Sequence, residues 1–185
     1  FAANQSAGQP VLAGVVDDIA PDASAASINK ATAYARSVAA DSIVALGGGS
    51  VLDAAKGIKY SLAHHLTDIQ DVLLGGIRLE TTPPSGPLGI PHIALPTTAG
   101  TGAEVTNGAV ILCDRLGGAK AGLVAPYLEA DIAVLDAALT VGLPRSITAD
   151  TGMDALTHAV EIVANANSNH FTDAGVFTAT ALIDK

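Results

Sequence analysis

Apolar and polar positions alternate between strand-like and helix-like patterns over the first part of the chain. Residues 11–16 and 42–46 are short apolar runs of strand length. Between them, apolar residues recur at helical spacing from a cap at Asp22 or Ser24 to about Ala40. A strand, a helix and a second strand in this order predict a parallel, right-handed unit and therefore an α/β fold with a parallel sheet.

The pattern changes character towards the carboxyl end. Further strands are predicted over residues 92–95, 106–112, 121–124 and 132–135. A glycine-bearing turn at residues 114–118 joins the middle two into a hairpin. Beyond Leu143 the pattern is helical and is broken by the polar turn at residues 165–169. We therefore expect an α/β domain over residues 1–143 and the beginning of a helical domain over residues 144–185.

The composition narrows the class of protein. The formal net charge is −9 and the isoelectric point about 4.7, which argues against a nucleic-acid partner. No apolar run approaches the ~20 residues that cross a bilayer, so we expect no membrane partner and a cytoplasmic location. The single cysteine, Cys113, excludes an internal disulfide framework and is interpreted as a small apolar residue on a strand.

A glycine turn follows the strand at residues 42–46. Gly47, Gly48, Gly49 and Ser50 lead directly into a segment with helical spacing. Glycines let the backbone approach a ligand closely, and the amides at a helix start favour an anion such as a pyrophosphate. The spacing is neither that of a Rossmann turn nor that of a P-loop, and a plain tight turn explains the same residues.

A threonine-rich loop follows the strand at residues 92–95. Its hydroxyls belong to Thr97, Thr98, Thr101 and Thr106, with small residues between them. Hydroxyls and open amides suit the oxygens of a sugar or a phosphate. Composition alone favours an ordinary loop rich in threonine and glycine.

A carboxylate and an imidazole lie four residues apart near the carboxyl end. Asp154 and His158 occur in a stretch with helical spacing, so their side chains share one helical face. Together they can supply half of a divalent-metal site. The alternative for such a pair taken alone is a surface ion pair.

Taken together, the three segments resemble the iron-containing (group III) alcohol dehydrogenase family, within the dehydroquinate-synthase-like fold. The resemblance is carried by residues 45–50 with Asp53 and Lys56, residues 96–102 with residues 104–106, and residues 151–161. It extends from about residue 10 to the last residue. Members of that family are roughly twice as long, and the chain therefore looks like an internal fragment, expected to be inactive by itself and to expose apolar surface over residues 155–183.

The resemblance implies that residues 1–143 bind a dinucleotide, although their amino-terminal part is incomplete. The cofactor-binding residues that it implies are Gly48, Gly49, Ser50, Asp53, Thr97, Thr98, Thr101, Thr106, Lys120 and Leu139. Three of them have ordinary explanations as well: Asp53 as an acid favoured by the helix dipole, Lys120 as a solvated hairpin residue, and Leu139 as one aliphatic residue among many. Lys56 is expected to be a solvated helix residue.

The resemblance also implies that residues 144–185 begin a truncated metal-binding domain. Asp154 and His158 match the first two metal ligands of the family, and two further histidines would come from later helices. His64 and His65 are expected at a helix end. His170 lies ~18 Å from His158 along a continuous helix, too far to share one ion. Fe(II) is the family's common metal, and Zn(II) is a rival because the ligand types do not separate the two.

The implied chemistry is hydride transfer between a small alcohol or aldehyde and NAD or NADP, with the metal site as the catalytic centre. A homodimer or larger homo-oligomer is expected. Alternatives are a zinc-type glycerol dehydrogenase or a maleylacetate reductase of the same fold. A catalytically silent nucleotide-binding fragment is a third alternative, of a different class.

Overall fold

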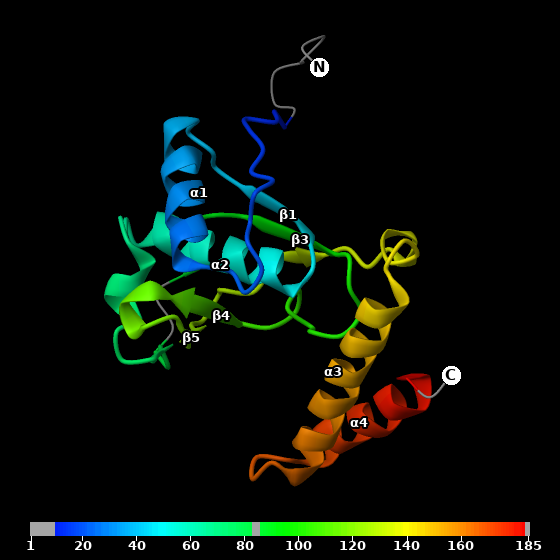
Figure 1. The fold of residues 1–185 in the computed structure, drawn as a ribbon. Coiled ribbons are helices and arrows are strands. Elements are labelled where there is room, and N and C mark those ends of the chain that lie inside the picture. Colours follow the sequence, from blue (N-terminus) through cyan, green and yellow to red (C-terminus); the bar gives the residue numbers. More distant parts are fainter. Residues whose placement is uncertain (1–9, 83–85, 184–185) are drawn as a thin grey trace.

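The computed structural model describes residues 10–82 and 86–183, which form an α/β body and a projecting pair of helices (Figure 1). The helices are α1 (Ala25–Ser37), α2 (Gly49–Ala63), α3 (Arg145–Ala164) and α4 (His170–Ile183). The strands are β1 (Ile43–Gly47), β2 (Ile77–Leu79), β3 (His92–Pro96), β4 (Gly108–Cys113), β5 (Ala119–Val124) and β6 (Ile132–Ala133). Short 3-10 turns are η1 (Ile69–Val72), η2 (Asp114–Leu116) and η3 (Ala137–Leu139).

The first sheet has the order β1-β3-β6, and all its strands are parallel. Ile43 pairs with His92 at one end of the β1–β3 ladder, and Gly47 pairs with Pro96 at the other. The predicted parallel sheet is confirmed. Because the carboxyl ends of parallel strands meet at one edge, the glycine turn after β1 and the threonine loop after β3 leave the sheet side by side.

The second sheet has the order β2-β5-β4. β4 and β5 form the predicted antiparallel hairpin, from Gly108 opposite Val124 to Cys113 opposite Ala119. Cys113 is buried on β4, as expected. β2 pairs in parallel with β5 and was not predicted, because its three residues, Ile77–Leu79, are all exposed and carry an arginine in the middle.

Helix α2 lies between the two sheets (Figure 1) and has buried side chains on both sides. Leu52 packs with Ala45 and Ala94 of the first sheet. On the other side, Tyr60 packs in a cluster with residues of α1, β4 and β5, including Leu123. Burying one such side chain stabilises the folded protein by about 2 kcal/mol. Because α2 buries side chains against both sheets, it is the centre of the fold.

Helix α1 begins where the sequence predicts. Ser24 is its N-cap and accepts a hydrogen bond from the amide of Ser27 at 3.2 Å. Such a cap contributes about 1 kcal/mol. Arg36, near the other end of α1, donates to the carbonyl oxygens of Ser61 and Leu66 and so holds the end of α2.

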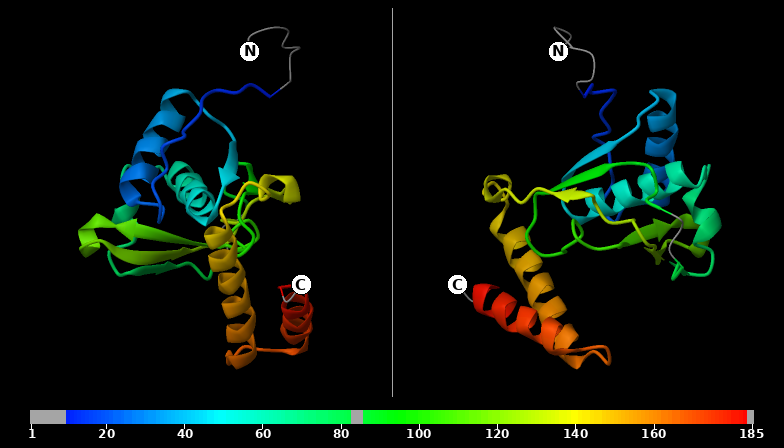
Figure 2. Two further views of the ribbon diagram at one scale, coloured as in Figure 1. Left: turned by 45° about the vertical axis from the view of Figure 1, so that its right-hand side comes forward. Right: turned by 180° about the vertical axis from the view of Figure 1, so that it is seen from behind.

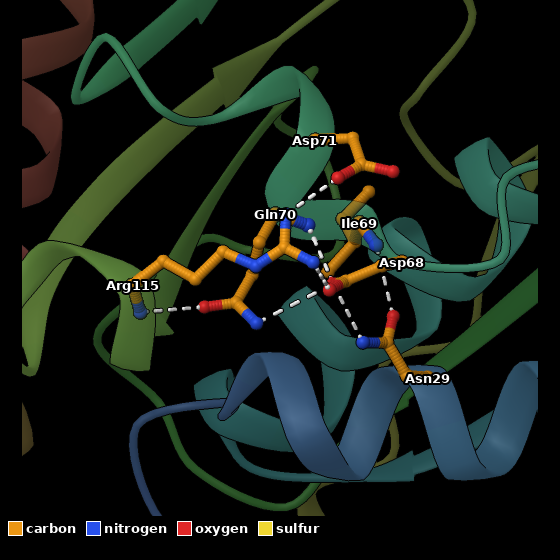
Figure 3. Close-up of polar contacts among 6 residues, drawn as sticks. All are labelled: Asn29, Asp68, Ile69, Gln70, Asp71 and Arg115. Carbon is orange, nitrogen blue, oxygen red and sulfur yellow. Dashed lines mark hydrogen bonds and ion pairs between the residues drawn. The ribbon is translucent and has the colours of Figure 1, made fainter.

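A polar network joins α1, η1 and η2 (Figure 3). Asn29 donates to Asp68 at 2.7 Å and accepts from the amide of Ile69 at 2.9 Å. Arg115 forms ion pairs with Asp68 and Asp71 at 2.6 and 2.5 Å. The network fixes a loop that carries little regular structure of its own.

One predicted strand is wrong. Residues 11–16 have no regular secondary structure, and Val11, Leu12 and Val15 are largely exposed. Their apolar pattern suits a strand, but they pair with no strand of the two described sheets. The strand expected over residues 132–135 exists as the shorter β6.

The helical pattern after Leu143 is confirmed, with α3 and α4 separated by the polar turn at residues 165–169. The two helices pack against each other and project from the α/β body (Figure 2). Apolar side chains on them are exposed as expected, and Phe171 and Phe177 are 94% and 73% accessible. No helix within the described ranges is both long and apolar enough to cross a membrane.

Candidate functional site

The glycine turn forms the start of α2. β1 ends at Gly47, and Gly48 is the N-cap residue, with an extended backbone and no side chain to cap the helix. The first amides of α2 are therefore available to an external acceptor. Helix N-termini of this kind favour anions.

The threonine loop packs directly against this turn. A Cβ atom added at Gly49 would lie 2.8 Å from Cγ2 of Thr101, and one at Gly48 would lie 3.3 Å from Cγ2 of Thr98. The amide of Thr97 donates to the carbonyl oxygen of Gly47 at 2.9 Å. Glycine is thus required at residue 49 by close approach, and the two segments that the sequence singled out form one surface.

Ser50 and Lys120 are connected through Asp22. The Ser50 hydroxyl accepts from the amide of Asp22 at 3.0 Å, and the Asp22 carboxylate forms an ion pair with Lys120 at 2.8 Å. Lys120 is half-exposed on β5. The structure therefore brings this lysine of the hairpin towards the beginning of α2.

Lys56 is buried beneath the same region, contrary to the expectation of a solvated residue. Its Nζ atom donates to Thr106 Oγ1 at 3.0 Å and to the Gly108 carbonyl oxygen at 2.6 Å, and pairs with Asp53 Oδ1 at 3.3 Å. The other Asp53 oxygen accepts from the amide of Val110 at 2.9 Å. Burial lowers the pKa of Lys56, and the Asp53 carboxylate opposes that effect.

The threonine loop also touches helix α3. A Cβ atom at Gly100 would lie 2.3 Å from the carbonyl oxygen of Thr151. Thr151 precedes Asp154 by one helical turn. The glycine turn thus packs against the threonine loop, and that loop packs against α3 one turn before Asp154. Leu139 lies apart from this series in η3, where it is half-buried.

Asp154 and His158 share one face of α3, as their spacing predicts. Asp154 Oδ1 and His158 Nε2 are 3.8 Å apart, and both side chains are about half-exposed. No cluster of three or more His, Cys, Asp or Glu side chains that could hold a metal occurs among the described residues. The pair is thus an accessible donor set with two members.

The other histidines lie elsewhere. His64 ends α2, where its ring stacks at 4.2 Å on that of Tyr60, and His65 follows it. His170 is exposed at the start of α4. His92 is the first residue of β3, in agreement with the strand predicted over residues 92–95, and it is fully buried.

A second buried lysine lies beside His92. Lys59 donates to the carbonyl oxygen of Glu129 at 2.8 Å and to Asp131 at 3.4 Å. Asp131 in turn accepts from the amide of His92 at 2.7 Å. Burial, together with the charges of Lys59 and Lys56, lowers the pKa of His92 to about 4. The imidazole is therefore neutral at physiological pH.

Comparison with known proteins gives a consistent result. The family model described as iron-containing alcohol dehydrogenase matches residues 3–137. The chain is 46% identical over 155 residues to the probable alcohol dehydrogenase EutG of Salmonella typhimurium, covering 84% of this chain and 37% of the relative. It is 40% identical over 173 residues to long-chain-alcohol dehydrogenase 1 of Geobacillus thermodenitrificans, covering 92% and 41%.

Solved structures support the fold. A 1,3-propanediol oxidoreductase superposes with a TM-score of 0.80 at 35% identity, covering 92% of this chain and 42% of that one. The sulfoacetaldehyde reductase of Bifidobacterium kashiwanohense, solved in complex with NAD+, gives 0.67 at 34% identity, covering 78% and 36%. The expected fold class is confirmed, and the chain spans about two fifths of the length of these relatives.

Proposed function

The chain belongs to the iron-containing alcohol dehydrogenase family, and we propose that the whole protein transfers a hydride between a small alcohol or aldehyde and NAD or NADP. One observation carries the proposal: α2 begins with two glycines against which the side chains of Thr98 and Thr101 pack, and the same threonine loop packs against α3, which carries the carboxylate–imidazole pair. The names of the relatives and the NAD+ in one of their structures agree with it.

The cofactor is proposed to lie along the edge where β1 and β3 end. Gly48, Gly49 and Ser50 would hold its pyrophosphate with backbone amides, because these amides form the start of α2. Thr98 and Thr101, which pack against Gly48 and Gly49, would add hydroxyls, as would Thr97, whose amide binds the Gly47 carbonyl oxygen. Further proposed contacts are Asp53, Thr106, Lys120 and Leu139.

The metal is proposed to bind Asp154 and His158. The two donors fit a divalent ion, because one anionic oxygen and one imidazole nitrogen lie accessible on one helical face. Fe(II) is proposed, with Zn(II) as the rival, and two histidines of later helices in the whole protein would complete the ligand set. When bound, the nicotinamide accepts the hydride and the metal polarises the alcohol oxygen.

The chain's own residues would orient the two reactants. The glycine turn and threonine loop would fix the dinucleotide, and the Gly100–Thr151 contact would fix that loop against α3, which carries the donor pair. We propose the corresponding division of labour, with residues 1–143 for the cofactor and residues 144–185 as the beginning of the metal-binding domain. A homo-oligomer is proposed for the whole protein.

The test is a turnover assay of the whole protein. Purified protein loaded with Fe(II) or Zn(II) is incubated with a panel of small alcohols and either NAD+ or NADP+, and formation of the reduced cofactor is followed by absorbance. We expect turnover with at least one pair, lost on treatment with a chelator and restored by metal. Tight cofactor binding without turnover on any substrate would instead indicate a nucleotide-binding module.

A further inference from the structure

Lys56 lies under two of the proposed cofactor contacts. Its side chain is fully buried, and its three ammonium hydrogens have three acceptors: Asp53, Thr106 and the Gly108 carbonyl oxygen. Thr106 is exposed, and the Asp53 side chain is 18% accessible. One buried cation thus supports two polar groups that reach the surface from different elements.

These contacts fix the direction of hydrogen bonding at Thr106. Its hydroxyl oxygen accepts from Lys56, so its own hydrogen is left to donate outwards. An outward donor suits an acceptor such as a phosphate or ribose oxygen. Without Lys56, the hydroxyl could rotate and direct its hydrogen elsewhere.

The same contacts fix Asp53 as an acceptor. One carboxylate oxygen faces the Lys56 ammonium, and the other accepts from the amide of Val110. The carboxylate thus uses one lone pair of each oxygen for a contact within the protein. The other lone pairs of the Asp53 carboxylate are left to accept hydrogen bonds from a hydroxyl or an amide of the ligand.

Packing alone does not explain a lysine at this place. Burial of an ammonium is expensive unless every hydrogen is paired, and an apolar side chain of similar volume commonly fills such a space at no loss of stability. The pairing of Lys56 is complete because the loop that contains Thr106 and the start of β4 turn their oxygens towards it. The cation therefore specifies the arrangement of these oxygens.

We propose that Lys56 is a positioning residue of the cofactor site, which orients Thr106 as a hydrogen-bond donor and Asp53 as a hydrogen-bond acceptor towards the dinucleotide. The inference rests on the proposed function. It adds a residue that acts through two others and touches no ligand itself.

The test compares variants of the whole protein by calorimetric titration with NAD+ and NADP+. Lys56→Met removes the cation and keeps the volume, and Thr106→Val removes the hydroxyl. Each should weaken binding of the preferred dinucleotide about tenfold, which is the loss of one charge-assisted or ligand hydrogen bond. The double variant should lose less than the two single losses combined, because both changes break the same unit. Thr106→Ser should retain wild-type affinity.

Lys59→Met is the matched control. Lys59 is also a buried lysine of α2, but its acceptors are Glu129 and Asp131. This variant should lose thermal stability and keep its dinucleotide affinity. Equal losses of affinity in Lys56→Met and Lys59→Met, or wild-type affinity in Lys56→Met, would overturn the inference.

Two further outcomes are decisive. If Lys56→Met does not fold, the comparison of Thr106→Val with Thr106→Ser decides, and wild-type affinity in Thr106→Val overturns the inference. If the wild-type protein binds neither dinucleotide, the proposed function fails and the role of Lys56 fails with it. That result differs from one in which the wild type binds and the Lys56 variant binds equally well.

Discussion

The imidazole of His92 lies in the interior of the fold, and neither ring nitrogen has a hydrogen-bond partner among the described residues. Lys59 and Lys56 lie close enough to disfavour its protonation, while Asp131 favours it weakly. A buried polar group without a partner costs about 1–3 kcal/mol. His92 is therefore a residue whose replacement should stabilise the protein.

His92 should also make stability depend on pH. Its pKa in the folded protein is about 4, below the ordinary value of 6.5, so between these pH values the unfolded chain binds more protons than the folded one. Stability should thus fall as the pH drops from 6.5 to 4, by an amount on the order of 3 kcal/mol from this residue. We predict that His92→Leu raises the melting temperature and flattens this decline in thermal scans of the whole protein.

The exposed His170 provides the control. His170→Gln should leave both the melting temperature and its dependence on pH unchanged. A melting temperature for His92→Leu below that of the wild type at pH 7 would contradict this account of the buried imidazole.

Residue-scale prediction succeeded where the cause is local. Ser24 could be identified as a helix cap because the hydroxyl and the amide that it meets lie three residues apart. Gly49 could be identified as a residue of the turn before a helix, because the glycines and the helical spacing that follows them are adjacent in the sequence. The burial of Lys56 could not be predicted, because its acceptors Thr106 and Gly108 lie in a loop and at the start of β4, 50 and 52 residues away. Its spacing from Asp53 was the one available signal.

At the scale of elements, the polar network of Figure 3 holds η1 between α1 and the hairpin. Asn29 is central to it, because it binds both the Asp68 carboxylate and the amide of the buried Ile69. We predict that Asn29→Ala destabilises the protein by about 1–3 kcal/mol, since the Ile69 amide loses its acceptor. Hydrogen exchange in peptides over residues 66–73 should accelerate.

The neighbouring Lys30 is the matched control for Asn29. It pairs with Asp18 on the surface, where both side chains are more than half-exposed. Exposed pairs of this kind contribute little to stability, because solvent and salt screen the two charges. Lys30→Ala should leave exchange over residues 66–73 unchanged, and acceleration as large as that in Asn29→Ala would argue against a specific role of the network.

Helices and strands with a regular spacing of apolar residues were predictable from the sequence. Short strands, or strands without such spacing, were not. Helix α2 and strand β3 follow from apolar spacing alone. β2 has three exposed residues. It is a strand only because it pairs with β5, more than 40 residues later in the sequence. Residues 11–16 show the reverse: their pattern suits a strand, but no described strand pairs with them.

At the scale of the whole molecule, the proposal separates a cofactor site from a metal site. We predict that His158→Ala and Asp154→Ala in the whole protein each lower metal content and abolish alcohol oxidation. Dinucleotide affinity should remain near the wild-type value, because the glycine turn and the threonine loop lie on the α/β body. Metal analysis, turnover and calorimetry measure the three quantities.

His64→Ala and His65→Ala are the controls for these variants, since both residues lie at the end of α2. They should change neither metal content nor turnover. If metal and turnover survived the loss of His158 and fell with His64, His92 or His170, the assignment of Asp154 and His158 would be wrong.

The most direct test of the central claim is a calorimetric titration of Gly49→Val with NAD+ and NADP+. A Cβ atom at residue 49 would lie 2.8 Å from Thr101, so valine must push the threonine loop away and cover the first amides of α2. Gly142→Val is the matched control, because no atom of the described residues, its two chain neighbours aside, lies within 4 Å of a Cβ atom there. The account predicts a loss of dinucleotide affinity of at least tenfold in Gly49→Val and none in Gly142→Val. Unchanged affinity in a folded Gly49→Val protein would contradict it.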